Sequence, residues 1–372
     1  MNEFEESTAA SSTSSANPQT SVGEQSAVNL EASASGAPNT PFSEQEVVKN
    51  AIPDTTLKRF ANIFTSLQNE LSKVFVGQPE LMLGSLVALF SGGHVLVESV
   101  PGLGKTLFAS ALGRALGCDF GRIQFTPDLM PSDVIGAPVF NMKTQEFNFR
   151  PGPIFTQILL ADEINRAPAK THAALLEAMQ ESSATVDSVT HPLPSPFFVI
   201  ATQNPIESEG TYRLPEAQID RFMFKIVADY PSETEELKIL SEHGKNVDVK
   251  DKLAAISPVL NAQEILELRQ LINDVYVAPQ LCDYINKIVR ATRNFPRLAF
   301  GASTRAGLAL TQGVRALAIF QGRGFATPDD VARLALPTLR HRVTMSPEAE
   351  IEGRSVDEIL TSLVRSIDVP RI

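Results

Sequence analysis

The sequence contains few of the residues that mark several large classes of protein. Two cysteines among 372 residues, Cys118 and Cys282, are too few for a disulfide scaffold. They also lack the close spacing of metal ligands. We expect both to remain reduced thiols, as is typical of a cytoplasmic protein.

The chain has no excess of positive charge. Lys and Arg total 32 against 43 Asp and Glu, for a net charge of −11. A general nucleic-acid binder needs a basic surface that displaces counterions from phosphates, so we expect no nucleic-acid partner. The acidity is concentrated in residues 1–46, which hold seven Glu and no basic residue. The remainder is only mildly acidic, with 36 acidic and 32 basic residues.

Long hydrophobic runs are also absent. The longest charge-free apolar candidate, residues 81–97, has 17 residues and is interrupted by Ser91, Gly92 and Gly93. A membrane span needs about 20 predominantly apolar residues. The chain begins Met-Asn-Glu-Phe-Glu-Glu, without the positive start and apolar stretch of a signal peptide. We expect a soluble, cytoplasmic protein with no direct membrane insertion.

What is present indicates a folded protein with a tail. The hydrophobic fraction of 43% is normal for a globular chain. Residues 1–45 are the exception, because they are acidic and rich in Ser and Thr and have almost no large apolar side chains. Such a segment cannot bury enough surface to offset its ordering entropy, so we expect disorder. Its role, as a tether, a phosphorylation target or a solubilising tail, stays open.

The middle of the chain alternates between strand and helix patterns. An amphipathic helix over residues 55–75 comes first, with apolar residues at intervals of three and four. Apolar runs at 94–97, 158–161, 197–201 and 222–227 then alternate with helical stretches such as 107–116 and 172–181. This order predicts an α/β core with a mainly parallel sheet covered on both faces. Continuous apolar strands fit such a sheet. We place the core at residues 50–235.

Helical patterns dominate after Pro231. A poorly patterned connector covers residues 244–258. We therefore expect a second, all-helical domain over residues 258–372. Its predicted helices cover residues 262–275, 280–293, 303–321, 328–339 and 356–366.

A glycine-rich loop joins the first strand of the core to a helix. Glycines let the backbone wrap closely around a phosphate, and the helix N-terminus faces the anion. Lys105 would reach the terminal phosphates, and the hydroxyl of Thr106 would bind Mg²⁺. Ser99 stands where the usual motif has its first glycine. The ordinary alternative is a plain strand-to-helix turn. The predicted phosphate-binding residues are Val100, Pro101, Gly102, Leu103, Gly104, Lys105 and Thr106.

Two later strands end in polar residues. The strand at 158–161 is followed by Asp162 and Glu163, and the strand at 197–201 leads to Asn204. Ligands of open α/β sheets bind at the carboxyl ends of the strands. Asp162 is predicted to hold Mg²⁺, Glu163 to polarise the attacking water, and Asn204 to orient that water. Taken alone, an Asp-Glu pair is usually a helix cap, and Asn before Pro205 a turn former.

These residues, in this order, resemble the AAA+ ATPases, and within them the MoxR group. The resemblance covers about residues 55–372. The stretches that carry it are residues 124–133 (QFTPDLMPSD), 159–167, 173–181 (AALLEAMQE), 209–212 (EGTY) and 214–222 (LPEAQIDRF).

The resemblance implies a P-loop core with a five-stranded parallel sheet, a helical lid, and further site residues. Val76, Gly77 and Gln78 match the segment that lines the adenine pocket, and Asn204 matches sensor 1. Arg221 matches the arginine finger that reaches a neighbouring subunit's γ-phosphate, and Arg305 matches sensor 2. A guanidinium suits the charge on a transferring phosphoryl group. Without the resemblance, each arginine would read as a local partner or part of a solvated face.

Some positions have no assigned role. Arg166 and the cluster Arg340-His341-Arg342 are further positive groups, and we expect the five histidines to be structural. Residues 134–149 and 185–194 each have the pattern of a hairpin inserted in the core. As the resemblance implies, these hairpins would contact a client; otherwise they are ordinary surface hairpins.

Three functions are weighed. The first is a ring-forming ATPase, expected as a hexamer, that uses ATP and Mg²⁺ to remodel a partner protein. The resemblance implies clients with von Willebrand factor A domains, or metal-centre and cofactor maturation. The second is a nucleotide-gated scaffold with little turnover, which only Ser99 favours. The third is a DNA motor or loader, disfavoured by the acidic balance and the absence of tryptophan.

Overall fold

The computed structural model describes residues 52–204, 212, 214–243 and 249–371. The chain divides into two units, Met1–Ser43 and Glu44–Ile372, and everything described below belongs to the second. The tail that is predicted to be disordered, residues 1–45, lies outside the described residues. Residues 205–211, which follow Asn204, also lie outside them.

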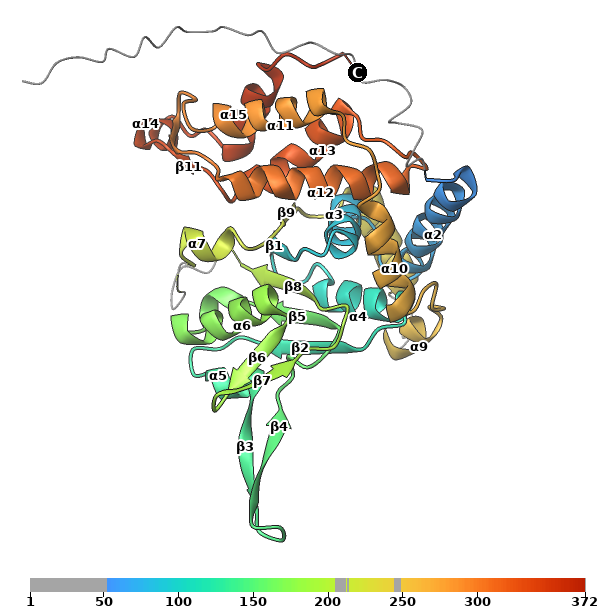
Figure 1. Cartoon of the computed structure of the whole chain (residues 1–372), viewed down its shortest axis with the longest axis vertical. Helices are drawn as coiled ribbons and strands as arrows, with labels where there is room; N and C mark the ends of the chain where they lie inside the picture. Colours follow the sequence, from blue (N-terminus) through green and yellow to red (C-terminus); the bar gives the residue numbers. More distant parts are fainter. Residues whose placement is uncertain (1–51, 205–211, 213, 244–248, 372) are drawn as a thin grey trace, which may run out of the picture. The chain divides into compact units, whose positions relative to one another are not determined.

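The core is built on a five-stranded parallel sheet (Figure 1). Its spatial order is β2-β5-β8-β1-β9, so the first strand in sequence lies inside the sheet. This confirms the expected parallel α/β core. The strands are β1 (Val95–Ser99), β2 (Phe120–Gln124), β5 (Ile158–Asp162), β8 (Phe198–Gln203) and β9 (Phe224–Ala228).

Alternate side chains of each central strand enter two separate hydrophobic clusters, because successive residues point to opposite faces. On β1, Val95 and Val97 pack with one cluster and Leu96 with the other. The first cluster lies under α3 (Pro79–Phe90) and α4 (Lys105–Ala115) and extends into the C-terminal helices. Burial on both faces explains why these strands read as continuous apolar runs.

The second cluster lies under α6 (Ala169–Glu181), which covers the other face together with the short α5 (Pro131–Ile135). The helix predicted at residues 55–75 is α2 (Asp54–Ser72), whose buried residues recur at helical spacing. Its Phe64 ring stacks on Phe320 of the C-terminal domain, with ring centroids 4.4 Å apart. The two domains therefore share one hydrophobic core.

The C-terminal domain is helical, as expected. Two features were not predicted there: the short helix α14 (Pro347–Ile351) and a two-stranded antiparallel sheet of β10 (Leu298–Phe300) and β11 (Thr344–Met345). These strands are too short to show a pattern in sequence. The predicted helices are α10 (Ala262–Ile272), α11 (Pro279–Ala291), α12 (Thr304–Phe320), α13 (Pro328–Leu339) and α15 (Val356–Arg365).

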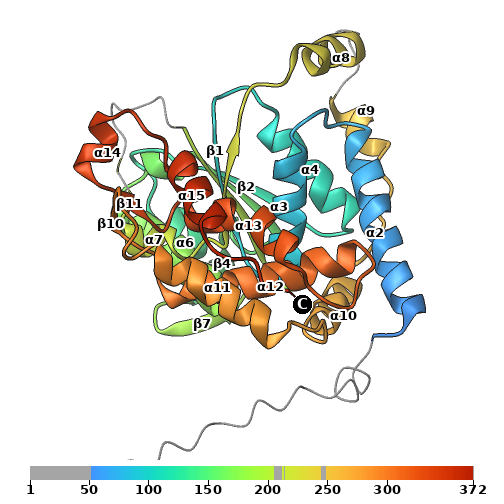
Figure 2. The same ribbon diagram turned by 90° about the horizontal axis from the view of Figure 1, so that it is seen from above.

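Along the chain, two helices come between the last strand of the sheet and this domain. The first is α8 (Glu233–His243), which directly follows the last strand, and the second is α9 (Val249–Ala254), within the predicted connector. In Figure 2, α8 lies at the top of the view, whereas α7 (Glu216–Ile219), α14, β10 and β11 lie together on the left.

Both predicted hairpins are present. The first, β3 (Gly136–Asn141) with β4 (Glu146–Pro151), projects away from the sheet (Figure 1). Phe140 and Phe147 are exposed on it, with ring centroids 5.2 Å apart. The second is β6 (Ser183–Val186) with β7 (Val189–Pro192). A stacked pair, Phe149 and His191, joins the two hairpins at 3.8 Å between ring centroids.

Within the described ranges, we find no helix whose length and apolar character would let it cross a membrane.

Candidate nucleotide-binding site

The loop between β1 and α4 has the geometry of an anion cradle. Gly102 and Gly104 have φ angles of +88° and +74°, which side chains with a Cβ rarely adopt. A Cβ on Gly102 would meet no atom within 4 Å, so the loop faces open space there. Gly104 is the N-cap of α4 and supplies no side chain to the first N–H groups of the helix. Those donors are thus available to an anion.

Lys105 lies at the start of α4 and is held by the loop itself. Its Nζ donates to Ser99 Oγ at 2.8 Å and to the Val100 carbonyl at 3.2 Å. Burial lowers the pKa of Lys105, while the nearby Asp162 and Glu163 oppose that shift. Lys105 and the two predicted carboxylates follow the carboxyl ends of β1 and β5, which belong to the same parallel sheet.

Ser99, the departure from the usual motif, ends β1 and is 3% exposed. It is not among the described residues with a positive φ, so the backbone there needs no glycine. The serine adds a hydrogen bond to Lys105 rather than a distortion of the loop.

The predicted acidic pair lies at the carboxyl end of β5. Asp162 is 7% exposed, and its Oδ1 accepts a hydrogen bond from Thr202 Oγ1 at 2.6 Å. The Thr202 hydroxyl also accepts from the Glu163 backbone N–H at 2.9 Å. Thr202, on the adjacent β8, thus fixes both residues. The sequence pattern did not single out Thr202, because a threonine inside a strand is unremarkable.

Two further side chains hold the Glu163 carboxylate. Gln124 Nε2, at the end of β2, donates to Glu163 Oε2 at 2.8 Å, and Arg166 Nε lies 3.1 Å from the same oxygen. Glu163 has a φ of +56°, an uncommon backbone conformation for a residue with a side chain. Such strain is often found at functional positions.

Asn204 follows β8 at the same edge of the sheet and is buried. The strand order places its strand between those that carry Asp162 and the loop. Next to it, Gln203 Nε2 donates to Glu98 Oε2, which also pairs with Lys225 Nζ at 2.8 Å. The predicted sensor 1 residue therefore lies beside an ordered polar cluster that was not expected.

An apolar cavity of about 210 Å³ adjoins the loop. It brings together Val76 and Gln78 from the predicted adenine segment and Gly102, Leu103 and Gly104 from the loop. Pro231 and Ile239 also line it, and the sequence pattern did not indicate either, since they lie far away in the chain.

The adenine segment is itself fixed in place. Gln78 Nε2 donates to the Asp229 carbonyl at 2.5 Å. Gly77 has a φ of +77°, and a Cβ there would lie 2.9 Å from Glu235 Oε1. Gly77 lies between two residues that line the cavity, Val76 and Gln78, but does not line it itself.

The two predicted arginines lie elsewhere. Among the described residues that line the cavity, neither Arg221 nor Arg305 occurs. Arg305, on α12, pairs with Asp220 at 3.4 Å between NH1 and Oδ2. Asp220 directly precedes Arg221, so the structure brings the two arginines to one region.

Arg342, for which the sequence offered no role, organises that region. Its side chain is 2% exposed, and its Nε donates to Asp220 Oδ1 at 2.7 Å. Its other nitrogens donate to the carbonyls of Asp220, Phe222 and Met223 at 2.6–3.0 Å. Arg342 therefore fastens the C-terminal domain to the segment that holds Arg221.

The oxygen donors near the loop suit Mg²⁺ that is bound together with phosphates. They do not suit a metal ion that is held by protein side chains alone. The part of the chain that the structure describes has no cluster of three or more His, Cys, Asp or Glu able to hold a metal. Thr106 is exposed at the start of α4, and Asp162 offers a carboxylate. Mg²⁺ is usually bound by one or two such oxygens together with phosphates and waters.

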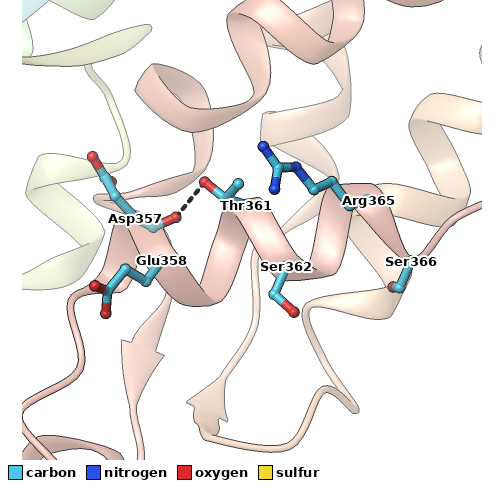
Figure 3. Close-up of a pocket in the computed structure, with 6 residues that line it drawn as sticks. All are labelled: Asp357, Glu358, Thr361, Ser362, Arg365 and Ser366. Atoms are coloured by element: carbon cyan, nitrogen blue, oxygen red, sulfur yellow. Dashed lines mark hydrogen bonds between the residues drawn. The ribbon is translucent and has the colours of Figure 1, made fainter.

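A second hollow lies along α15, lined by Asp357, Glu358, Thr361, Ser362, Arg365 and Ser366 (Figure 3). All six come from one helix and the residue after it, and Thr361 Oγ1 donates to the Asp357 carbonyl at 2.6 Å. A single helix face cannot enclose a ligand, so we assign no site there.

Comparison with known proteins agrees with this geometry. A model of the ATPase family associated with various cellular activities (AAA) matches residues 94–224, and a model of the AAA lid domain matches residues 290–363. The chaperone MoxR1 of Mycobacterium tuberculosis is 41% identical, over 82% of this chain and 81% of that protein. The protein YeaC of Bacillus subtilis is 46% identical, over 81% of this chain and 92% of that protein.

A solved structure from Cytophaga hutchinsonii has the same fold. It superposes with a TM-score of 0.79 at 39% identity, covering 85% of this chain and 98% of that one. Family match, close relatives and fold agree, and the chain belongs to the MoxR group of the AAA+ ATPases, with an AAA core and a helical lid.

Proposed function

We propose that this chain hydrolyses ATP with Mg²⁺ and uses the cycle to remodel a partner protein, as a ring of identical subunits. One observation carries the proposal: an uncapped helix N-terminus, Lys105 and two carboxylates meet at one edge of the sheet, beside an apolar cavity. The cavity suits a base, and the helix end suits phosphates.

Each side chain then has a role in hydrolysis. The loop N–H groups and Lys105 bind the phosphates, and Thr106 and Asp162 hold the metal. Bound Mg²⁺ would neutralise charge that develops on the phosphate oxygens. Glu163 accepts a proton from the attacking water, and Asn204 orients that water. Val76, Gly77 and Gln78 position the adenine.

The ring is supported by the placement of the arginines. Arg221 and Arg305 share a region with Asp220, and neither lines the cavity beside the loop. In a ring, this region of one subunit would face the nucleotide of the next. Both arginines would then act on a neighbour's γ-phosphate, which makes assembly a condition for turnover. A hexamer is the state we expect.

Exposed apolar side chains lie both on α8, beside the cavity, and on α12, near Arg305. Leu237 and Leu240 of α8 are 60% and 68% exposed on the helix whose Ile239 lines the cavity. Leu308, one helical turn after Arg305, is 69% exposed. Exposed apolar patches are typical of surfaces that another protein covers. Two different patches suit the head-to-tail contacts of a ring.

The partner protein is proposed to dock on the hairpins. The exposed Phe140 and Phe147 rings near the tip of the first hairpin offer an apolar contact. The named relative MoxR1 is a chaperone, which supports a remodelling role. We propose a client with a von Willebrand factor A domain or a protein complex that acquires a metal centre.

Phosphate release by the wild type and by Glu163→Gln tests the proposal. We expect steady release by the wild type in Mg²⁺ and at least a hundredfold less by the variant, which should still bind ATP. Equal, background-level rates in both would leave the nucleotide-gated scaffold as the function. DNA that stimulates release and binds tightly in a salt-sensitive way would favour a DNA motor instead.

A further inference from the structure

The guanidinium of Arg122 is paired with Asp162, the carboxylate that is predicted to hold the metal. Arg122 lies on β2, the strand that pairs with β5, and its NH2 donates to Asp162 Oδ2 at 2.7 Å. The same NH2 donates to Gln124 Oε1 at 2.6 Å. The pair therefore has a fixed geometry at the edge strand of the sheet.

Both oxygens of Asp162 are engaged in this state. Thr202 donates to Oδ1 and Arg122 to Oδ2. A carboxylate oxygen can accept more than one partner, so the hydrogen bond from the neutral Thr202 hydroxyl does not prevent metal binding. The positive guanidinium at Oδ2 does oppose it, because two cations on one carboxylate repel each other. Arg122 is the partner that can leave, because its side chain is 45% exposed whereas that of Asp162 is 10% exposed.

The ion pair between Arg122 and Asp162 is weak enough to be displaced by a metal ion. Partly exposed arginine–carboxylate pairs stabilise proteins only weakly, since the guanidinium regains water when the pair opens. A divalent cation fixed by phosphates, a carboxylate and Thr106 would gain more. Arg122 also leaves a positive charge near the metal after displacement, which lowers the affinity for Mg²⁺ further.

We propose that Arg122 is a tethered cation that pairs with Asp162, the predicted metal ligand, and must be displaced when Mg²⁺ binds with nucleotide. Arg122 thereby raises the Mg²⁺ concentration that nucleotide binding requires. It prevents a bare carboxylate from standing unpaired in a half-buried site. The inference rests on the proposed function, because it assigns Asp162 to the metal of bound ATP.

Nucleotide affinity measured against Mg²⁺ concentration tests this inference. The probe is a fluorescent ADP, titrated into wild type, Arg122→Ala and Arg122→Lys, first in EDTA and then at a series of Mg²⁺ concentrations. We expect Arg122→Ala to reach half of its Mg²⁺-dependent gain in affinity at about threefold to tenfold less Mg²⁺. Its affinity in EDTA should equal that of the wild type. Arg122→Lys keeps the charge and should remain near the wild-type midpoint.

A matched control removes a positive charge outside the site. Arg59, exposed on α2, is changed to Ala, and the Mg²⁺ midpoint of this variant should equal that of the wild type. Circular dichroism and thermal melting establish that each variant is folded.

The outcomes distinguish a failure of the role of Arg122 from a failure of the proposed function. Equal Mg²⁺ midpoints for wild type and Arg122→Ala would overturn the role of Arg122 alone. A large loss of affinity in EDTA would also overturn it, because Arg122 would then bind the phosphates directly. Absence of nucleotide binding by the wild type at every Mg²⁺ concentration would overturn the proposed function, and this inference with it.

Discussion

Ser99 and Lys105 are hydrogen-bonded across the loop, with Oγ and Nζ 2.8 Å apart. A serine in place of the first motif glycine therefore supports the lysine that the motif requires. The scaffold interpretation depended on Ser99 as a defect. The observed contact supports nucleotide binding instead.

Removal of that hydroxyl should have a small effect. In Ser99→Ala, Lys105 keeps the Val100 carbonyl as a partner and loses one hydrogen bond, worth about 1 kcal/mol. We expect nucleotide affinity to change by less than about tenfold. Titration with fluorescent ADP measures this, with Lys105→Ala as the severe comparison. A loss in Ser99→Ala as large as in Lys105→Ala would make the serine an essential ligand.

The placement of Arg221 predicts complementation between subunits. Arg221→Ala should bind ATP with nearly wild-type affinity and hydrolyse it at least a hundredfold more slowly, because in the proposed ring the guanidinium would act on a neighbour's nucleotide. Glu163→Gln is inactive for a different reason. In mixed rings some interfaces pair an intact Glu163 with an intact Arg221.

Phosphate release by the 1:1 mixture should therefore exceed that of either variant alone. The control is the double variant, with Glu163→Gln and Arg221→Ala in one chain, at the same total protein concentration as the mixture. If the mixture stays as inactive as its components, although rings form, the arginine does not act in trans.

Arg342 should contribute strongly to stability. It is buried and bonds to the Asp220 carboxylate and four carbonyl groups, so its removal leaves a carboxylate without its main partner. Breaking a buried pair in this way costs about 3–5 kcal/mol. We expect urea denaturation of Arg342→Ala to show a free energy of unfolding lowered by about that amount.

Arg59→Ala is the matched control, since Arg59 forms only an exposed pair with Glu264 at 3.6 Å. Its unfolding midpoint should shift little. Equal midpoints for Arg342→Ala and Arg59→Ala would mean that Arg342 does not fasten the lid to the core.

His94 makes the core sensitive to acid. Its Nδ1 accepts from the Val199 N–H and its Nε2 donates to the Met179 carbonyl, so the ring is neutral. Burial lowers the pKa of His94 to about 4 from 6.5. The unfolded chain thus binds the proton more readily, and stability is present above pH 6.5 and is lost as the pH falls toward 4.

The expected loss from this residue is about 2 kcal/mol between pH 7.5 and pH 5. Burial lowers the pKa values of His172 and His341 as well, which adds to the loss in the same direction. Chemical denaturation at both pH values measures it. His94→Gln should be less stable at pH 7.5 but lose less on acidification. A slope equal to the wild type's would show that His94 does not carry the effect.

Sequence patterns located the phosphate loop, the acidic pair and four of the five strands because all of them depend on local signals. Apolar runs identify strands buried on both faces, whereas β2, with Gly121, Arg122 and Gln124, is mostly only partly buried and has no such run. The contacts of Arg122 and Gln124 to the acidic pair were missed with it.

Other contacts could not be read from the chain because their partners are distant in sequence. Arg342 meets Asp220 only after the helical domain packs on the core. Ile239 lines the cavity with the loop only after α8 has packed beside it. The structural role expected for the five histidines stays a prediction; His94, His172 and His341 are buried, as such a role requires. The assigned roles of Arg221, Arg305 and Asn204 stay predictions.

The most direct test of the account is a crystal structure of the protein with Mg²⁺ and a non-hydrolysable ATP analogue at saturating concentration. The account predicts phosphates against the backbone from Val100 to Thr106, the base in the cavity beside Gln78, and the ion at Asp162 with Arg122 turned away. An empty loop and cavity, or a nucleotide bound elsewhere on the chain, would contradict it.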